Sequence, residues 1–168
     1  MVIILMGVSG SGKSVVGNIL SKAIASGYAE GDEFHSEANV EKMRGGTPLN
    51  DEDRWPWLDS MAEAIDGWRA EGKTMILACS ALKRVYRDIL MGSRDDVLAV
   101  HLKGSKELIS SRLSVRKHEY MPSTLLQSQF DTLEEPDDSE NVITVSIDAT
   151  PETIVKNIVD RLKARGLV

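Results

Sequence analysis

A glycine-rich octet near the N-terminus limits the folds open to this chain more strongly than any other feature. It follows the β-branched, Leu-rich run Val2–Met6, which is typical of a strand buried on both faces of a parallel sheet. Apolar residues then recur at helical spacing through Gly12–Ala25. The octet itself reads Gly7-Val8-Ser9-Gly10-Ser11-Gly12-Lys13-Ser14 and matches the pattern GxxxxGK[ST]. Buried strand, glycine-rich turn and helix in this order predict a phosphate-binding loop, or P-loop.

The chemistry of this loop follows from its residue types. Glycines let the backbone wind so that its N–H groups point inward at phosphate oxygens, and the helix N-terminus adds about half a positive charge. Lys13 is expected to contact the β and γ phosphates, and the Ser14 hydroxyl is expected to bind Mg²⁺. All eight residues are therefore candidates for binding a nucleoside triphosphate.

The remaining apolar runs alternate between strand and helix patterns. The expected strands are Tyr28–Asp32, Thr74–Cys79, Val97–Leu102 and Val142–Ile147. The expected helices are Arg54–Ala70, Ala81–Met91 and Pro151–Arg165. Alternation of strands and helices predicts an α/β fold with a parallel sheet.

Composition narrows the functional classes. A chain of 168 residues with 42% apolar and 27% charged residues fits one domain, residues 1–168, with its own core. The net charge of −6 argues against a nucleic-acid partner, which would require a basic face. The single thiol, Cys79, cannot form an intrachain disulfide, and Val2–Met6 is too short for a membrane span or signal-peptide core. We therefore expect no membrane partner and a cytoplasmic location.

Two polar segments interrupt the alternation. Phe34–Asp53 connects the second expected strand to the next helix, and Ser114–Glu140 precedes the last expected strand. Segments of this length in a compact domain are usually binding inserts or lids.

Two carboxylates follow the second expected strand. Strand alternation predicts that Glu30 and Asp32 point to the same side, at the sheet edge that also carries the P-loop. Asp32 could accept the proton of an attacking hydroxyl, while Glu30 could order Mg²⁺-bound water. The alternative is a solvated acidic turn. A guanine-reading NKxD string does not occur, which makes a GTPase unfavourable.

Two arginines stand at the entrance to the second polar segment. Arg112 and Arg116 are four residues apart, on one face of a helix. An arginine delivered from a closing segment stabilises charge on a phosphoryl group in transfer, so Arg116 is a candidate catalytic residue and Arg112 a candidate nucleotide-binding residue. A solvated helix end is the alternative for both.

Several longer strings resemble the gluconokinases, and the resemblance runs nearly from end to end. They are Gly7 to Ser14, Gly31-Asp32-x-x-His35, Glu41-Lys42-Met43, Gly46-Thr47-Pro48-Leu49-Asn50-Asp51-Glu52-Asp53-Arg54-Trp55-Pro56-Trp57-Leu58, Cys79-Ser80-Ala81-Leu82-Lys83-x-x-Tyr86-Arg87-Asp88 and Gln129-Phe130-x-Thr132-Leu133-Glu134-x-Pro136. The strings Pro48 to Leu58 and Cys79 to Asp88 are far more specific than the P-loop, which many families share.

The resemblance implies ATP- and Mg²⁺-dependent phosphorylation of D-gluconate on its terminal hydroxyl, giving 6-phospho-D-gluconate. It implies a five-stranded parallel sheet in the order 2-3-1-4-5, a substrate-binding segment at about 34–72, a lid at about 114–136 and a homodimer. Asp32 would bind and activate the hydroxyl. The family usually has an Asp where this chain has Glu30. Residues 148–151 would either lie beside the adenine of ATP or cap the last helix.

A sugar acid requires a cation for its carboxylate and polar groups for its hydroxyls. Arg54, Lys83 and Arg87 are candidates for the first task, and His35 and Ser80 for the second. Each has a plainer interpretation: Arg54 could brace its helix, Lys83 and Arg87 could lie on a solvated face, and His35 could serve the turn alone.

Three hypotheses follow. The leading one is a gluconate kinase; the second is a kinase for another small hydroxy acid, such as shikimate, on the same fold. The third is a switch that hydrolyses ATP slowly to change shape, which would leave Asp32, Arg54 and Lys83 without a purpose.

Overall fold

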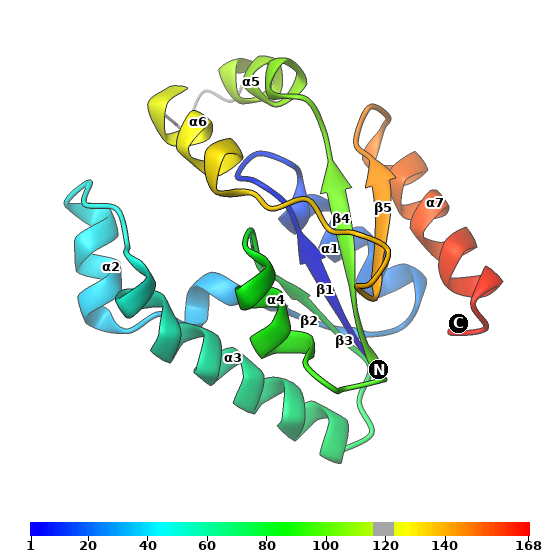
Figure 1. The fold of residues 1–168 in the computed structure, drawn as a ribbon. Coiled ribbons are helices and arrows are strands. Elements are labelled where there is room, and N and C mark those ends of the chain that lie inside the picture. Colours follow the sequence, from blue (N-terminus) through cyan, green and yellow to red (C-terminus); the bar gives the residue numbers. More distant parts are fainter. Residues whose placement is uncertain (116–122) are drawn as a thin grey trace.

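A five-stranded parallel sheet with helices on both faces forms the centre of the computed structural model, which describes residues 1–115 and 123–168 (Figure 1). The strand order is β2-β3-β1-β4-β5, so the predicted order 2-3-1-4-5 is confirmed. The strands are β1 (Val2–Met6), β2 (Gly27–Glu30), β3 (Met75–Ala78), β4 (Val97–Lys103) and β5 (Val142–Ser146).

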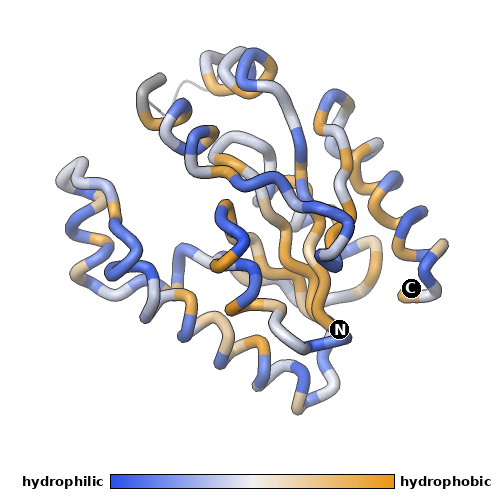
Figure 2. Tube along the Cα trace, in the orientation of Figure 1, coloured by the Kyte–Doolittle hydropathy of each residue, from blue (hydrophilic) through white to orange (hydrophobic). Residues whose placement is uncertain are grey.

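Strand β1 lies at the centre because all five of its residues are apolar and both of its faces are covered. Ile3 and Leu5 pack on one face of the sheet, while Val2, Ile4 and Met6 pack on the other. In register, Val2 pairs with Met75 of β3 and Val97 of β4. Figure 2 shows the apolar residues gathered in these central strands.

Seven helices are described. They are α1 (Lys13–Ala23), α2 (Glu37–Arg44), α3 (Asp51–Ala70), α4 (Arg84–Met91), α5 (Lys106–Val115), α6 (Ser123–Thr132) and α7 (Pro151–Ala164). Helices α1 and α7 pack on the face of Ile3 and Leu5, and α3 and α4 pack on the opposite face. In Figure 1, α5 and α6 stand beyond the carboxyl end of β4, and α2 projects at the far end of α3.

Two helices begin three residues away from their predicted starts, and both differences have a local cause. Helix α3 begins at Asp51, three residues before the predicted start, because the Asn50 side chain accepts the Asp53 N–H at 2.8 Å and the Asp53 carboxylate accepts the Asn50 N–H at 3.1 Å. Helix α4 begins at Arg84 rather than Ala81, because Ala81 has φ +45°, outside the helical region.

The apolar stripe of α3 faces inward. Trp57, Leu58, Met61 and Ile65 are buried against the sheet. Within the described residues, the strongly exposed large apolar side chains lie on other elements; they are Val15, Met43, Val85, Leu125, Leu167 and Val168.

None of the helices in residues 1–115 and 123–168 combines the length and the apolar character needed to cross a bilayer.

Candidate active site

The P-loop joins β1 to α1 and takes a conformation that glycine makes accessible. Gly10 has φ +82° and Gly12 has φ +94°, both in the left-handed region. A Cβ atom on Gly10 would lie only 2.9 Å from the Leu113 side chain of α5, so this glycine also permits close contact with α5. The confirmed sequence of strand, glycine turn and helix brings the octet to the carboxyl edge of the sheet.

Lys13 folds back over this loop. Its ammonium donates to the carbonyl oxygens of Gly7 at 2.9 Å and Val8 at 3.1 Å. Burial lowers the pKa of Lys13, while the nearby Asp32 and Glu30 act in the opposite direction. Both carboxylates thus lie close enough to influence this lysine.

Ser14 and Glu30 are in direct contact. The Ser14 hydroxyl donates to Glu30 Oε1 at 2.7 Å, and the Tyr28 hydroxyl donates to the same oxygen at 2.5 Å. Burial and the bond to Glu30 raise the pKa of Tyr28, which keeps the phenol protonated as a donor. A hydroxyl and a carboxylate beside a phosphate cradle are oxygen ligands of the kind that Mg²⁺ prefers.

Asp32 reaches the site by a route that differs from the prediction. Strand β2 ends at Glu30, and Gly31–Phe34 forms a 3-10 turn, so strand alternation does not orient Asp32. The cause is local packing: Trp57 Nε1 donates to the Gly31 carbonyl at 2.8 Å, and a Cβ on Gly31 would lie 2.7 Å from the Ala78 carbonyl. These contacts fix Gly31 at the start of the turn, and the Asp32 side chain that follows it is exposed.

His35 lies at the end of that turn. Its ring stacks on Trp57 with centroids 4.3 Å apart and planes 13° apart. Burial lowers the pKa of His35, with Asp32 acting to raise it and Arg54 to lower it further. The ring also borders a hollow of about 430 Å³ lined by His35, Glu37, Val40, Glu41 and Arg44.

Arg54 and Lys83 come together on one carboxylate that sequence reasoning did not single out. Asp51 accepts from Lys83 Nζ at 3.2 Å and from Arg54 at 3.4 Å, and the Tyr86 hydroxyl also donates to it. The Tyr86 bond, more than the cations, lowers the pKa of Asp51. The position of Asp51 one helical turn before Arg54 was the available signal. Because Arg54 and Lys83 both pair with Asp51, the three side chains together carry one net positive charge.

Ser80 follows β3 beside the P-loop. Its carbonyl accepts the Gly7 N–H at 3.2 Å, and its side chain is half-buried. The structure thus brings Ser80 to the nucleotide loop, as well as toward the segment that carries Lys83.

Arg87 is not placed with the other candidate cations. Its side chain is 1% exposed, and all five of its N–H donors have protein acceptors: two on Glu140, and the carbonyls of Ala81, Leu82 and Glu134. Neither the predicted substrate contact nor a solvated helix face fits this geometry, because a fully bonded buried guanidinium has no donor left for a ligand. Arg87 instead ties the start of α4 to residues 134–140.

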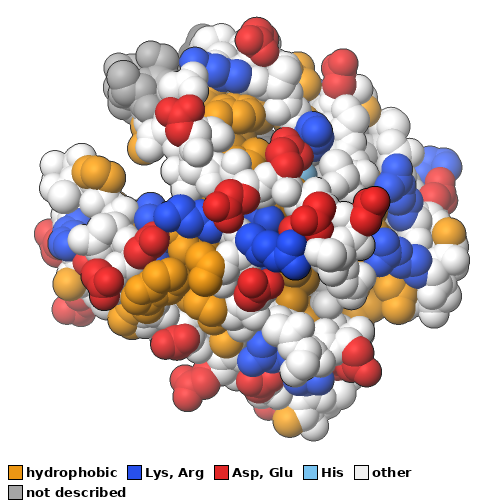
Figure 3. All heavy atoms as spheres, in the orientation of Figure 1, with side chains coloured by type: hydrophobic (Ala, Val, Ile, Leu, Met, Phe, Trp, Pro, Cys, Tyr) orange, Lys and Arg blue, Asp and Glu red, His pale blue; other side chains and the backbone are white. Residues whose placement is uncertain are grey.

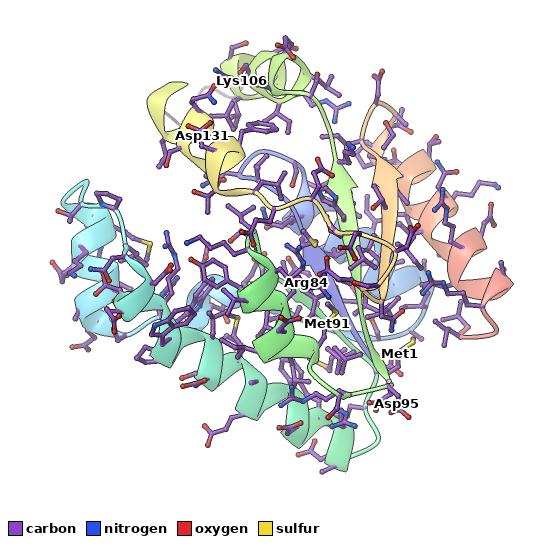
Figure 4. The ribbon with its side chains drawn as sticks, in the orientation of Figure 1. Met1, Arg84, Met91, Asp95, Lys106 and Asp131 are labelled. Atoms are coloured by element: carbon purple, nitrogen blue, oxygen red, sulfur yellow. The ribbon has the colours of Figure 1, made fainter. Side chains whose placement is uncertain are left out.

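Helices α5 and α6 contact the P-loop and each other. Arg112 donates to the Ala149 carbonyl at 3.5 Å, within the segment 148–151, where Thr150 also caps α7 as predicted. The side chain of Gln127 accepts a hydrogen bond from Lys106 and donates one to Asp131 at 2.7 Å. Lys106 of α5 and Asp131 of α6 are labelled in Figure 4. Arg116 lies outside the described residues.

A hollow is visible on the surface of the molecule (Figure 3). In the space-filling view the surface is hollowed between the end that carries α2 and the end that carries α5 and α6, with basic and acidic side chains along its border (Figure 3). The P-loop, Glu30, Asp32 and the Arg54–Lys83 pair all belong to the elements at this edge of the sheet.

Known proteins of similar sequence extend over almost the whole chain. A family model described as an AAA domain matches residues 3–166. A probable gluconokinase of Xenopus tropicalis is 46% identical over 94% of this chain and 91% of its own length. The gluconokinase of Arabidopsis thaliana is 44% identical over 95% of this chain and 90% of its own.

Solved structures of known kinases are also similar to this chain. A gluconokinase from Sinorhizobium meliloti 1021 superposes with a TM-score of 0.84 at 37% identity, covering 97% of this chain and 95% of that one. Shikimate kinase from Aquifex aeolicus superposes with a TM-score of 0.64 at 19% identity, over 99% of both chains, which shows a shared fold.

Proposed function

Since the chain belongs to the gluconokinase family, we propose that it transfers the γ-phosphoryl group of ATP to the terminal hydroxyl of D-gluconate, giving 6-phospho-D-gluconate and ADP. The observation that carries this proposal is the arrangement at one edge of the sheet: a phosphate cradle, an exposed carboxylate at Asp32 and the Arg54–Lys83 pair. These are the three groups that a sugar-acid kinase requires.

The nucleotide would occupy the P-loop, with Gly7 to Ser14 around its phosphates. Lys13 would exchange the carbonyls of Gly7 and Val8 for phosphate oxygens, a change that gives charged partners to a partly buried ammonium. Arg112 and the segment 148–151, already in contact, would lie beside the adenine.

Ser14 and Glu30 would hold Mg²⁺, Ser14 through its hydroxyl and Glu30 through an intervening water. Their contact at 2.7 Å supports this role, because both oxygens already face one point next to the cradle. When bound, the ion neutralises charge on the β and γ phosphate oxygens. Glu30 has a longer side chain than the family's usual Asp, and Tyr28 holds it in place.

Two contacts would orient gluconate: its carboxylate would bind the cation cluster, and its terminal hydroxyl would bind Asp32. The cluster of Arg54, Lys83 and Asp51 retains one net positive charge, which suits a substrate with one carboxylate. His35 and Ser80 would bond hydroxyls along the chain of the sugar acid. Among the candidates that the structure describes, only Arg87 has contacts that argue against its predicted role.

The transfer step moves one proton and one phosphoryl group. Asp32 would accept the proton of the terminal hydroxyl as its oxygen forms a bond to the γ phosphorus, and the bond from phosphorus to the bridging oxygen of ADP breaks in line. Lys13 would stabilise the charge that develops on the transferred group, joined by Arg116 from the lid.

Further features of the proposal come from the family. Residues 1–168 would act as one catalytic domain, with the substrate segment at about 34–72 and the lid at about 114–136. A homodimer and a cytoplasmic location stay predictions.

An acceptor panel tests the function. ATP consumption with Mg²⁺ is measured with D-gluconate, shikimate, glucose, adenylate or no acceptor. We expect stimulation by gluconate alone, with 6-phosphogluconate formed. Stimulation by shikimate instead would favour the second hypothesis, and slow turnover indifferent to every acceptor would favour the switch.

A further inference from the structure

Asn39 of α2 is a buried polar residue to which the proposed reaction assigns no task. Its side chain is 6% exposed, and its amide nitrogen has two contacts. Nδ2 lies 2.9 Å from the Asp53 carbonyl oxygen at the start of α3 and 3.2 Å from Nδ1 of His35. One amide group therefore bridges α3 and the histidine that ends the 3-10 turn.

The Asp53 contact decides which end of the amide is the nitrogen. A backbone carbonyl only accepts hydrogen bonds, so the atom that faces it must be the NH₂ group of Asn39 and not its oxygen. The hydrogen bond to Asp53 therefore fixes the orientation of the Asn39 amide.

The second N–H of the same amide determines the protonation of His35. Because this N–H points at Nδ1, that nitrogen must offer a lone pair. A neutral imidazole that accepts at Nδ1 carries its proton on Nε2. No described residue hydrogen-bonds Nε2, so its N–H is left for a ligand.

The surroundings of the His35 ring hold its orientation and favour its neutral form. Trp57 stacks on the ring and is itself held by its bond to the Gly31 carbonyl. The charged groups that face His35 are Asp32 from its own turn and Arg54 from α3; Glu37, Glu41 and Arg44 of α2 border the adjoining hollow. Burial lowers the pKa of His35 against the attraction of Asp32.

We propose that Asn39 is a positioning residue that locks His35 in the tautomer with its proton on Nε2, so that His35 donates a hydrogen bond to an oxygen of the sugar acid. The donor role rests on the proposed function, whereas the tautomer does not. In this state His35 cannot take the proton of the substrate hydroxyl at Nε2, and Asp32 is left as the base.

The first test measures the wild-type protein and uses one variant only to assign its signals. Long-range ¹H–¹⁵N spectra of the unliganded protein report both nitrogens of its three histidines, and His35→Gln identifies the signals of His35. We expect Nδ1 of His35 at an acceptor shift and Nε2 at an N–H shift at pH 8, where the ring is neutral. A proton on Nδ1, or an equal mixture of tautomers, would overturn the lock.

The second test separates the donor role from the proposed function. Gluconate added to the unliganded protein should shift the His35 Nε2–H signal. If 6-phosphogluconate is formed by the enzyme and this signal does not move, the donor role is wrong while the kinase function stands.

Asn39→Asp offers the converse change, since a carboxylate accepts a bond from Nδ1–H. We expect the His35 proton to move to Nδ1, the KM for gluconate to rise about tenfold and the KM for ATP to stay within about twofold. Asn141→Asp is the matched control: Asn141 also donates to a backbone carbonyl, that of Val97 at 3.1 Å, but lies near the start of β4. The control should leave the tautomer and both KM values unchanged, and an Asn39→Asp variant that folds and retains the Nε2 proton would contradict the lock.

Discussion

Gln129 of α6 bonds twice to Ser9 of the P-loop: the Ser9 N–H donates to Oε1 at 2.6 Å, and Gln129 Nε2 donates to the Ser9 hydroxyl at 2.8 Å. A helix within the second polar segment thus contacts the nucleotide cradle directly. Leu113 of α5 packs against Gly10 of the same loop, so both helices adjoin the phosphate site.

The charge of residue 129 should therefore matter to nucleotide binding. Gln129→Glu keeps an acceptor for the Ser9 N–H but adds a negative charge beside the triphosphate, so we expect the KM for ATP to rise at least tenfold. Gln129→Ala should raise it less and should speed hydrogen exchange of the Ser9 amide. Steady-state kinetics and exchange measurements check this pair; equal KM values for ATP in both variants would contradict the assignment.

Arg87 should act on stability rather than on substrate affinity. Arg87→Ala leaves the Glu140 carboxylate, 4% exposed, without its partner, which costs about 3–5 kcal/mol in the free energy of unfolding. Arg84→Ala, a control at a half-exposed neighbour paired with Asp137, should cost about 1 kcal/mol or less. Denaturant titration measures both. A stable Arg87→Ala variant with a raised KM for gluconate would return Arg87 to the substrate site.

The same pair predicts a pH dependence. Burial would raise the pKa of Glu140, but its bonds to Arg87 outweigh burial and leave the pKa below its ordinary value. A depressed pKa in the folded state contributes stability above the unfolded value of about 4.3, and this contribution is lost as the pH falls through the folded value. Glu140→Gln should therefore lose less stability than the wild type between pH 6 and pH 3, measured by unfolding at each pH. An identical acid dependence would assign the loss to other groups.

The Arg54–Lys83 pair should act on gluconate. Lys83→Met removes a charged donor and keeps the length of the side chain, so we expect the KM for gluconate to rise about 10- to 100-fold with the KM for ATP unchanged. Lys73→Met, at an exposed lysine paired with Glu71, is the control. If Lys83→Met lowers stability and leaves the KM for gluconate unchanged, Lys83 serves only to hold Asp51.

Local patterns were sufficient to predict the frame of this fold. Val2–Met6 and the octet after it form a strand and a P-loop because burial and glycine conformations are properties of adjacent residues. The strand order came from the family resemblance. Asp32 shows the limit of alternation, since its position depends on a bond between Trp57 and Gly31, residues 26 apart in the chain.

Long-range contacts explain what the sequence did not reveal. Arg87 was interpreted as a surface or substrate cation because its partner, Glu140, lies 53 residues away. Asp51, Asn39 and Gln129 were not singled out for the same reason: each acquires its task from a partner on another element. Such pairings become visible only when the helices are placed around the sheet.

The role of Asp32 is the centre of the proposed mechanism, and one substitution tests it most directly. In Asp32→Asn, the rate of 6-phosphogluconate formation from ATP and gluconate in a single turnover should fall by about 10²–10⁴, since the base is lost. The Kd for ATP should stay within about twofold, and Asp59→Asn, at an exposed position of α3, should change neither quantity. A variant that transfers phosphate at the wild-type rate, or that loses ATP binding instead, would contradict the assignment of Asp32 as the base.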